Sequence, residues 1–178
     1  LATVQTTGFI GENDTWGGEG IFAGLYDRLS MSAGYSRFDT DGWRTNADQE
    51  DNIANLFTQY DITYKTSVQA EYRYRDNERG DLEKTFFSDD FLPHLRQEDE
   101  TDSLRIGCRH SFSPSSDLIG NFQYADGDRS LHDEERDPIA IFPIFNFDLR
   151  GEDEAYSGEL SYLFRSDFIN LVGGAGYF

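Results

Sequence analysis

The sequence predicts an all-β protein, an antiparallel up-and-down transmembrane β-barrel (a meander) of about nine strands. Three observations predict it. Polar and apolar residues alternate with a period of two along most of the chain. Short and long connections alternate between the resulting strands, and the acidic residues gather in the long ones. This combination is typical of barrels that cross a membrane with strands of about 9–11 residues.

Composition excludes several other classes of protein. Aromatic residues make up 15% of the chain, which argues against a disordered segment, while the mean hydropathy is −0.65. No apolar run approaches the roughly 18 residues that a transmembrane helix needs. The formal net charge of −19 disfavours a nucleic-acid partner, whose phosphates require Lys and Arg. Seventeen glycines and many aromatics suit strands with one apolar and one polar face.

Five segments alternate clearly enough to be predicted as strands. In the best of them, Val68, Ala70, Tyr72 and Tyr74 alternate with polar residues over 67–75. The other four segments are 104–112, 118–124, 156–164 and 169–177. Weaker alternation predicts four further strands near 1–10, 20–27, 29–38 and 52–62.

Nine strands leave an unpaired edge, which is costly in lipid because its backbone groups lack partners. We therefore expect residues 1–178, a single barrel domain, to be part of a larger barrel. The alternative is that Ile139 to Leu149 adds a strand or folds inward over the lumen.

The connections predict which end of the barrel faces outward. Short turns are expected at 27–28, 62–65, 114–116 and 165–167, and long polar stretches at 11–19, 39–51, 76–102 and 126–154. These four stretches hold 28 of the 34 acidic residues and 7 of the 15 basic ones. Because barrels of the outer membrane have short periplasmic turns and longer external loops, we expect extracellular loops near 39–51, 76–102 and 126–154.

Aromatic residues fall near both ends of the predicted strands. Tyr35, Tyr72, Tyr74, Tyr124 and Tyr156 lie toward the long connections, and Tyr60, Tyr64, Phe112, Phe164 and Phe168 toward the short turns. Two aromatic girdles at the two membrane interfaces would produce this arrangement. Aromatic enrichment in an ordinary strand core is the alternative.

Part of the chain resembles a known class of membrane protein. The stretches Ala70 to Leu82, Phe91 to Gln97 and Asp102 to Leu118 are similar to the barrel region of large bacterial outer-membrane proteins that are linked to tetratricopeptide repeats or are TonB-dependent-receptor-like. The resemblance implies a bacterial outer-membrane location in contact with lipid and lipopolysaccharide, and a periplasmic repeat module or a partner chain. No repeat, TonB box or plug is recognisable in the sequence, so no functional residue is carried over.

A group of arginines forms the most specific polar feature. Arg73 and Arg75 lie on the non-apolar face of one predicted strand, and Arg105 and Arg109 on that of the next. We expect all four to line the lumen together with Glu71, which we expect to pair with Arg109. The strip would guide anionic or hydroxyl-rich solutes, as charged rings set the selectivity of pores. The alternative is a web of ion pairs that only satisfies charge.

Other candidate sites are weak. Asp39-Thr-Asp-Gly42 and Asp126-Gly-Asp128 are two turn-prone clusters rich in oxygen ligands, so Asp39 with Asp41, and Asp126 with Asp128, are candidate Ca²⁺ or divalent-cation ligands. Both lack the full calcium-binding loop with its terminal Glu, and the alternative is a solvated surface loop. No catalytic motif occurs, and we expect neither an enzyme nor an organic cofactor. Phe86, Phe87, Phe91 and the run 139–147 are apolar islands in acidic surroundings, which would cap the mouth, enter the lumen or contact a partner.

The predicted barrel is compatible with two functions from different classes. The first is a porin-like channel for small polar solutes or for a polysaccharide. The second is a structural barrel that anchors or encloses a partner, such as a repeat domain or an electron-carrying protein, and has no open pore. A soluble acidic β-sandwich adhesin is the third and weakest hypothesis.

Overall fold

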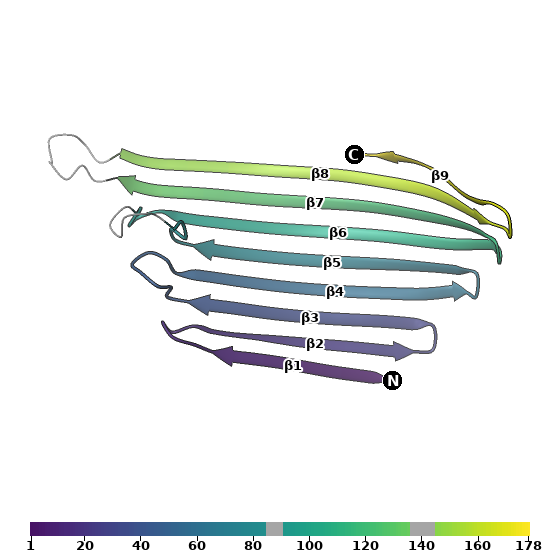
Figure 1. Ribbon diagram of the computed structural model, residues 1–178, viewed down its shortest axis with the longest axis horizontal. Coiled ribbons are helices and arrows are strands. Elements are labelled where there is room, and N and C mark those ends of the chain that lie inside the picture. The colour runs from purple at the N-terminus through teal and green to yellow at the C-terminus, as the bar shows by residue number, and fades with distance from the viewer. Residues whose placement is uncertain (85–90, 136–144) are drawn as a thin grey trace.

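A computed structural model of the chain describes residues 1–84, 91–135 and 145–178. Nine strands form one sheet in the order β1-β2-β3-β4-β5-β6-β7-β8-β9, and every neighbouring pair is antiparallel (Figure 1). The strands are β1 Ala2–Ile10, β2 Trp16–Tyr26, β3 Leu29–Thr40, β4 Gln49–Thr63, β5 Thr66–Arg79, β6 Arg96–Ser113, β7 Ser116–Glu135, β8 Phe145–Arg165 and β9 Asn170–Tyr177. The predicted all-β meander of nine strands is confirmed.

The sheet is open at both edges. β1 pairs only with β2, and β9 pairs only with β8, so the described strands do not close into a barrel. The residues that the structure describes contain no helix long and apolar enough to cross a membrane.

Tight turns lie at one end of the sheet and the wider connections at the other, as Figure 1 shows. Two residues each join β2 to β3, β4 to β5 and β6 to β7, and residues 166–169 join β8 to β9. In the first of these turns Asp27 adopts a left-handed φ of 51°, a conformation that Asp tolerates better than most residues. The alternation of short and long connections predicted from the sequence is thus present in the fold.

The strands extend much further into the acidic segments than the sequence predicted. β5 continues to Arg79, β6 begins at Arg96, and β7 and β8 continue through most of 126–154. The residues of these acidic segments can pair because the cross-strand ladder is formed by backbone N–H and C=O groups, whatever the side chains are. Of the apolar islands, Phe86, Phe87 and 139–144 lie outside the described residues, and β8 begins at Phe145.

Cross-strand register sorts the side chains onto two faces, because directly paired residues point to the same side of a sheet. One face, here called the tyrosine face, carries the row Ala70, Ile106 and Phe122 across β5, β6 and β7. The other, the arginine face, carries the neighbouring row Gln69, Gly107 and Asn121. The period-two assignment of the five best predicted strands agrees with this register.

The sheet is a single layer without a hydrophobic core between layers. Its accessible surface is 13132 Å², whereas a compact monomer of 20.4 kDa would expose about 8,800 Å². Among the described hydrophobic residues only Ala47 and Leu95 are buried, and both lie in connections rather than in strands. The cross-strand ladder is therefore the main source of order in the strands.

Hydrogen bonds join the connections β3–β4 and β5–β6 at the end of the sheet opposite the tight turns, a region here called the corner. The Asn46 side-chain amide donates to the carbonyl oxygens of Leu92 at 2.6 Å and Leu95 at 3.0 Å. The buried Asp81 carboxylate accepts backbone N–H groups of Glu83 and Leu92, both at 2.9 Å, and pairs with Arg44 at 3.3 Å. The two buried hydrophobic residues among those described, Ala47 and Leu95, both belong to these two connections.

Replacing Gly80 with alanine should loosen this corner. A Cβ at position 80 would lie 2.2 Å from the Asn46 carbonyl oxygen, so the backbone itself would have to move. We expect the Gly80→Ala variant to lose about 1–3 kcal/mol of unfolding free energy in a urea titration. Gly20→Ala is the control, because nothing lies within 4 Å of its Cβ position. An equal loss in both variants would contradict the packing of the corner.

Candidate functional site

The tyrosine face carries a band that is free of charged side chains. Between the tight turns and the first carboxylates it presents five uncharged residues on each of β5 to β8. On β5 these are Thr66, Val68, Ala70, Tyr72 and Tyr74. The band continues over β6, β7 and β8 with Leu104, Ile106, Cys108, His110, Phe112, Ser116, Leu118, Gly120, Phe122, Tyr124, Tyr156, Gly158, Leu160, Tyr162 and Phe164.

The apolar side chains of this band are open to the surroundings. Ile106, Phe122 and Leu160 are 48%, 45% and 52% exposed in the middle of the sheet. Soluble monomers rarely expose continuous apolar patches larger than a few hundred Å². Exposed apolar patches of this kind mark contact surfaces for proteins, membranes or ligands.

Tyrosines form the border of the band on the side of the long connections. The Tyr35 hydroxyl donates to Asn52 Oδ1 at 2.8 Å, and the Tyr156 hydroxyl donates to Glu154 Oε2 at 3.2 Å. The hydroxyl of Tyr72 bonds in the same way to the Asp102 carboxylate. Each hydroxyl thus reaches polar residues on the side of the long connections, which suits the amphipathic tyrosine side chain with its apolar ring and polar tip.

The arginine face brings together the five residues that the sequence singled out. Glu71 pairs directly with Arg105 across β5 and β6, Arg73 with Ser103, and Arg75 with Thr101. Arg109 lies further along β6, opposite Ser67. All five lie on one face of two adjacent strands, as predicted.

Their ion pairs differ from the prediction. Glu71 contacts Arg105 at 3.3 Å and Arg73 at 3.6 Å, whereas the predicted pair of Glu71 with Arg109 does not form. Arg109 instead binds Asp117 on β7 at 3.1 Å. The cause is the register, which places Glu71 and Arg109 four residues apart along β6.

Arg75, the fourth arginine of the strip, is paired as well, so the strip carries no unopposed arginine. Arg75 binds Asp51 on β4 through two nitrogens, at 2.9 and 3.2 Å. Each of the four guanidinium groups therefore faces a carboxylate on its own or a neighbouring strand. Because these pairs are largely exposed, each contributes little to stability, on the order of 0–1 kcal/mol.

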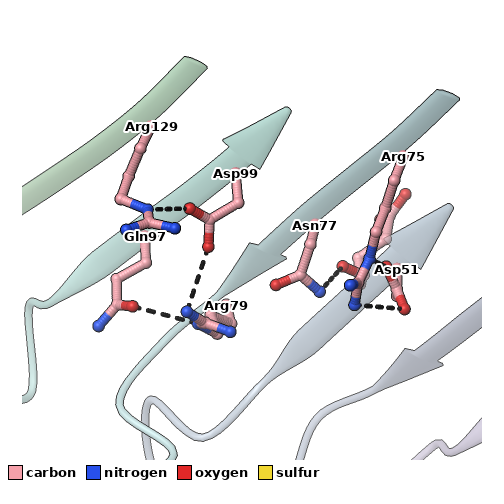
Figure 2. Close-up of polar contacts among 8 residues, drawn as sticks. Asp51, Arg75, Asn77, Arg79, Gln97, Asp99 and Arg129 are labelled. Atoms are coloured by element: carbon pink, nitrogen blue, oxygen red, sulfur yellow. Dashed lines mark hydrogen bonds and ion pairs between the residues drawn. The ribbon is translucent and has the colours of Figure 1, made fainter. Parts of the chain in front are cut away.

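The ion-pair network extends into residues that sequence reasoning missed, as Figure 2 shows. Asp99 on β6 accepts from Arg79 on β5 at 3.1 Å and from Arg129 on β7 at 2.5 Å, so one carboxylate joins three strands. Gln97 accepts a further bond from Arg79 at 3.1 Å. These residues lay in segments predicted as loops. The signal was present, because the alternation of Arg73 and Arg75 continues through Asn77 to Arg79.

Beyond the tyrosines, the tyrosine face becomes strongly acidic. Ten carboxylates from β4 to β8 form this part, here called the acidic end: Glu50, Asp76, Glu78, Glu98, Glu100, Asp102, Asp126, Asp128, Glu152 and Glu154. Many lie directly opposite one another, as Asp76, Glu100 and Asp128 do. Like charges in such pairs destabilise a sheet. Among the residues described, Glu50 alone of the ten forms an ion pair, with Arg37 at 2.9 Å.

The repulsion is reflected in the titration of two β5 carboxylates. Partial desolvation and the nearby charges of Glu100, Glu50 and Glu98 raise the pKa of Asp76. Partial desolvation and the charges of Glu98, Asp76 and Glu50 raise the pKa of Glu78, against the opposing effect of Arg96. Both groups thus resist ionisation in the folded sheet.

The predicted calcium ligands do not come together. Asp39 is the penultimate residue of β3 and pairs with Arg37 at 3.1 Å, and Asp41 lies in the connection that follows. Asp126 and Asp128 lie inside β7 on the tyrosine face, so the turn predicted at Asp126-Gly-Asp128 is wrong. Within residues 1–84, 91–135 and 145–178, no group of three or more His, Cys, Asp or Glu side chains is arranged to hold a metal ion.

Comparison with protein-family models gives no match, and comparison with curated proteins gives no significant match.

Neutralising Asp76 should stabilise the sheet at neutral pH. Because its pKa is raised in the folded state, the repulsion is absent below about pH 4, where the unfolded group is already protonated, and it grows as the pH rises through the folded pKa. We expect Asp76→Asn to gain roughly 0.2–1 kcal/mol of unfolding free energy at pH 7. The gain should disappear as the pH is lowered toward 4.

Asp153→Asn provides the control for this experiment. Asp153 lies on the arginine face of β8 opposite Gly127, with no carboxylate directly across from it on β7. Its replacement should leave the unfolding free energy at pH 7 unchanged or slightly reduced. A gain in both variants would mean that overall negative charge, and not the cross-strand contacts of the acidic end, sets the pH dependence.

Proposed function

We propose that this chain forms part of the wall of a bacterial outer-membrane β-barrel that serves as a channel for polar solutes or a polysaccharide. One observation carries the proposal. The band on the tyrosine face holds no Asp, Glu, Lys or Arg over β5 to β8 and one titratable His110, whereas the arginine face of the same strand segments holds Glu71, Arg73, Arg105 and Arg109. Strands that face lipid on one side and water on the other require this asymmetry.

The dimensions of the band support a membrane setting. On β5 the band from Thr66 to Tyr74 rises about 26 Å along the strand at 3.3 Å per residue. At the tilt of about 40° found in such barrels this corresponds to a height of about 20 Å, against roughly 25 Å for their apolar belt. A lipid-facing Arg or Lys costs roughly 2–4 kcal/mol at the midplane. The exclusion of charge from one face of four consecutive strands is thus what lipid exposure would select.

The acidic end supports an orientation. It lies beyond the tyrosines, on the side of the long connections, which face outward in outer-membrane barrels. Its carboxylates would stand at the level of the lipopolysaccharide head groups, where divalent cations shared with the phosphates would screen their repulsion. This proposed role is collective and does not need a preformed metal site.

The arginine face would then line the lumen, where its side chains would offer hydrogen bonds to a solute but little net charge. A structural barrel that encloses a partner chain is the second candidate function. The observation that favours it is the network of closed ion pairs, because a face whose charges satisfy one another does not need a permeating ion.

The lipid-facing assignment predicts different tolerance to arginine at two isoleucines. Ile106 lies in the middle of the band, whereas Ile21 lies on the arginine face of β2, opposite the uncharged residues Gln5 and Gly34. We expect Ile106→Arg to cost roughly 2–4 kcal/mol of unfolding free energy in phospholipid vesicles, and Ile21→Arg to cost less than half as much. Equal costs at the two positions, measured by reversible urea unfolding, would refute the membrane-facing assignment.

Conductance separates the two candidate functions. If the protein is a channel, planar bilayers that contain it should show discrete conductance steps, and the ion pairs of the arginine face should keep the anion–cation selectivity weak. Replacing Arg73, Arg75, Arg105 and Arg109 by Gln should then shift the reversal potential toward cations. Inserted protein that conducts no ions would support the structural barrel.

A further inference from the structure

A hollow in the arginine face lies over the middle of β5, β6 and β7. Its volume is about 510 Å³, and Gly107 is among the residues that line it. The polar side chains that line it are those of Gln59, Ser67, Gln69, Arg105, Arg109, Asn121 and Gln123. Its lining therefore consists mainly of amides, a hydroxyl and two guanidinium groups.

Gly107 of β6 forms part of the floor of the hollow. Its direct cross-strand partners are Gln69 on β5 and Asn121 on β7. A Cβ at position 107 would lie 2.9 Å from Cγ and Nε2 of Gln69, so the Gln69 side chain already lies over the glycine. The Gln69 side chain thus covers Gly107 from the β5 side, and Asn121 stands across from it on β7.

The charges around the hollow are already matched. Arg105 binds Glu71 at 3.3 Å and the side-chain oxygen of Gln123 at 3.4 Å. Arg109 binds Asp117 through Nε and Nη2, at 3.3 and 3.1 Å. Neither arginine is an unopposed cation, yet each guanidinium has five N–H donors and keeps some of them for a ligand.

These groups fit a ligand with hydroxyls better than an anion. A sugar hydroxyl both donates and accepts hydrogen bonds, and a side-chain amide offers two donors and an acceptor to match it. Ile119, which also lines the hollow and is 39% exposed, offers an apolar contact for the C–H face of a sugar ring. An anionic solute would instead have to compete with Glu71 and Asp117 for the arginines.

We propose that the Gly107 hollow is a binding subsite for a neutral saccharide. The subsite rests on the proposed channel function and deepens it, because it assigns the solute class to uncharged, hydroxyl-rich chains. It also replaces the expectation that the arginines select anions. Recognition comes from amides positioned by the ladder of β5, β6 and β7, with the arginines as additional donors.

The test is a titration of the full chain, folded in detergent micelles, with maltoheptaose and with an oligogalacturonate of the same length, followed by ligand-observed NMR. We expect saturable binding of the neutral sugar, and binding of the anionic sugar that is no tighter. Gly107→Trp fills the hollow and should weaken maltoheptaose binding roughly tenfold or more, since it removes several hydrogen bonds. Asn121→Leu, which removes an amide without filling the hollow, should weaken the binding in the same direction.

Gly127→Trp is the matched control. Gly127 lies on the arginine face of β7 outside the hollow, with no heavy atom nearer than 3.7 Å to its Cβ position. Its replacement should leave maltoheptaose binding unchanged. Absence of saturable binding, tighter binding of the anionic sugar, or equal loss in the Gly107 and Gly127 variants would overturn the proposal. Because binding in micelles needs no pore, its failure is distinguishable from a failure of membrane insertion or conductance.

Discussion

The cross-strand hydrogen-bond ladder is the constraint on which the rest of this structure depends. A single-layer sheet has no second layer to bury side chains against, and its strands contain no buried hydrophobic residue among those described. The ladder fixes the backbone, and each face must then match whatever surrounds it. In a protein with a packed core the sequence of a strand is fitted to neighbouring side chains, whereas here it is fitted to two different environments.

Charged side chains are mostly paired with opposite charges on the arginine face, and mostly stand opposite like charges on the tyrosine face. On the arginine face each cation of the predicted strip lies beside a carboxylate, and Asp99 links β5, β6 and β7 through two arginines. On the tyrosine face the carboxylates of the acidic end stand opposite one another with few cations. A chain of net charge −19 thus keeps one face nearly balanced and places its excess on part of the other.

Much of this arrangement was predictable from the sequence, because side-chain parity needs only a period of two. That rule placed Ile106 on one face and Arg105 on the other, and it grouped the four arginines correctly. The register was not predictable in the same way. β5 and β6 are joined by a long connection, whose length does not fix which residues stand opposite each other, so the partner of Glu71 was misassigned. Strand ends were also missed, because loop-like residues such as Asp126 and Gly127 form regular strand when both faces are polar.

The unequal length of the strands has a consequence for how anything would approach the sheet. β1, β2 and β3 have 9, 11 and 12 residues, whereas β6, β7 and β8 have 18, 20 and 21. Beyond the tyrosine border, β8 continues for about 36 Å at 3.3 Å per residue. The rim of the sheet is consequently slanted, low beside β1 and high beside β8 (Figure 1). A large molecule such as an antibody or a phage fibre would meet the tall acidic hairpin first, while a small solute would reach the arginine face most directly over the low side.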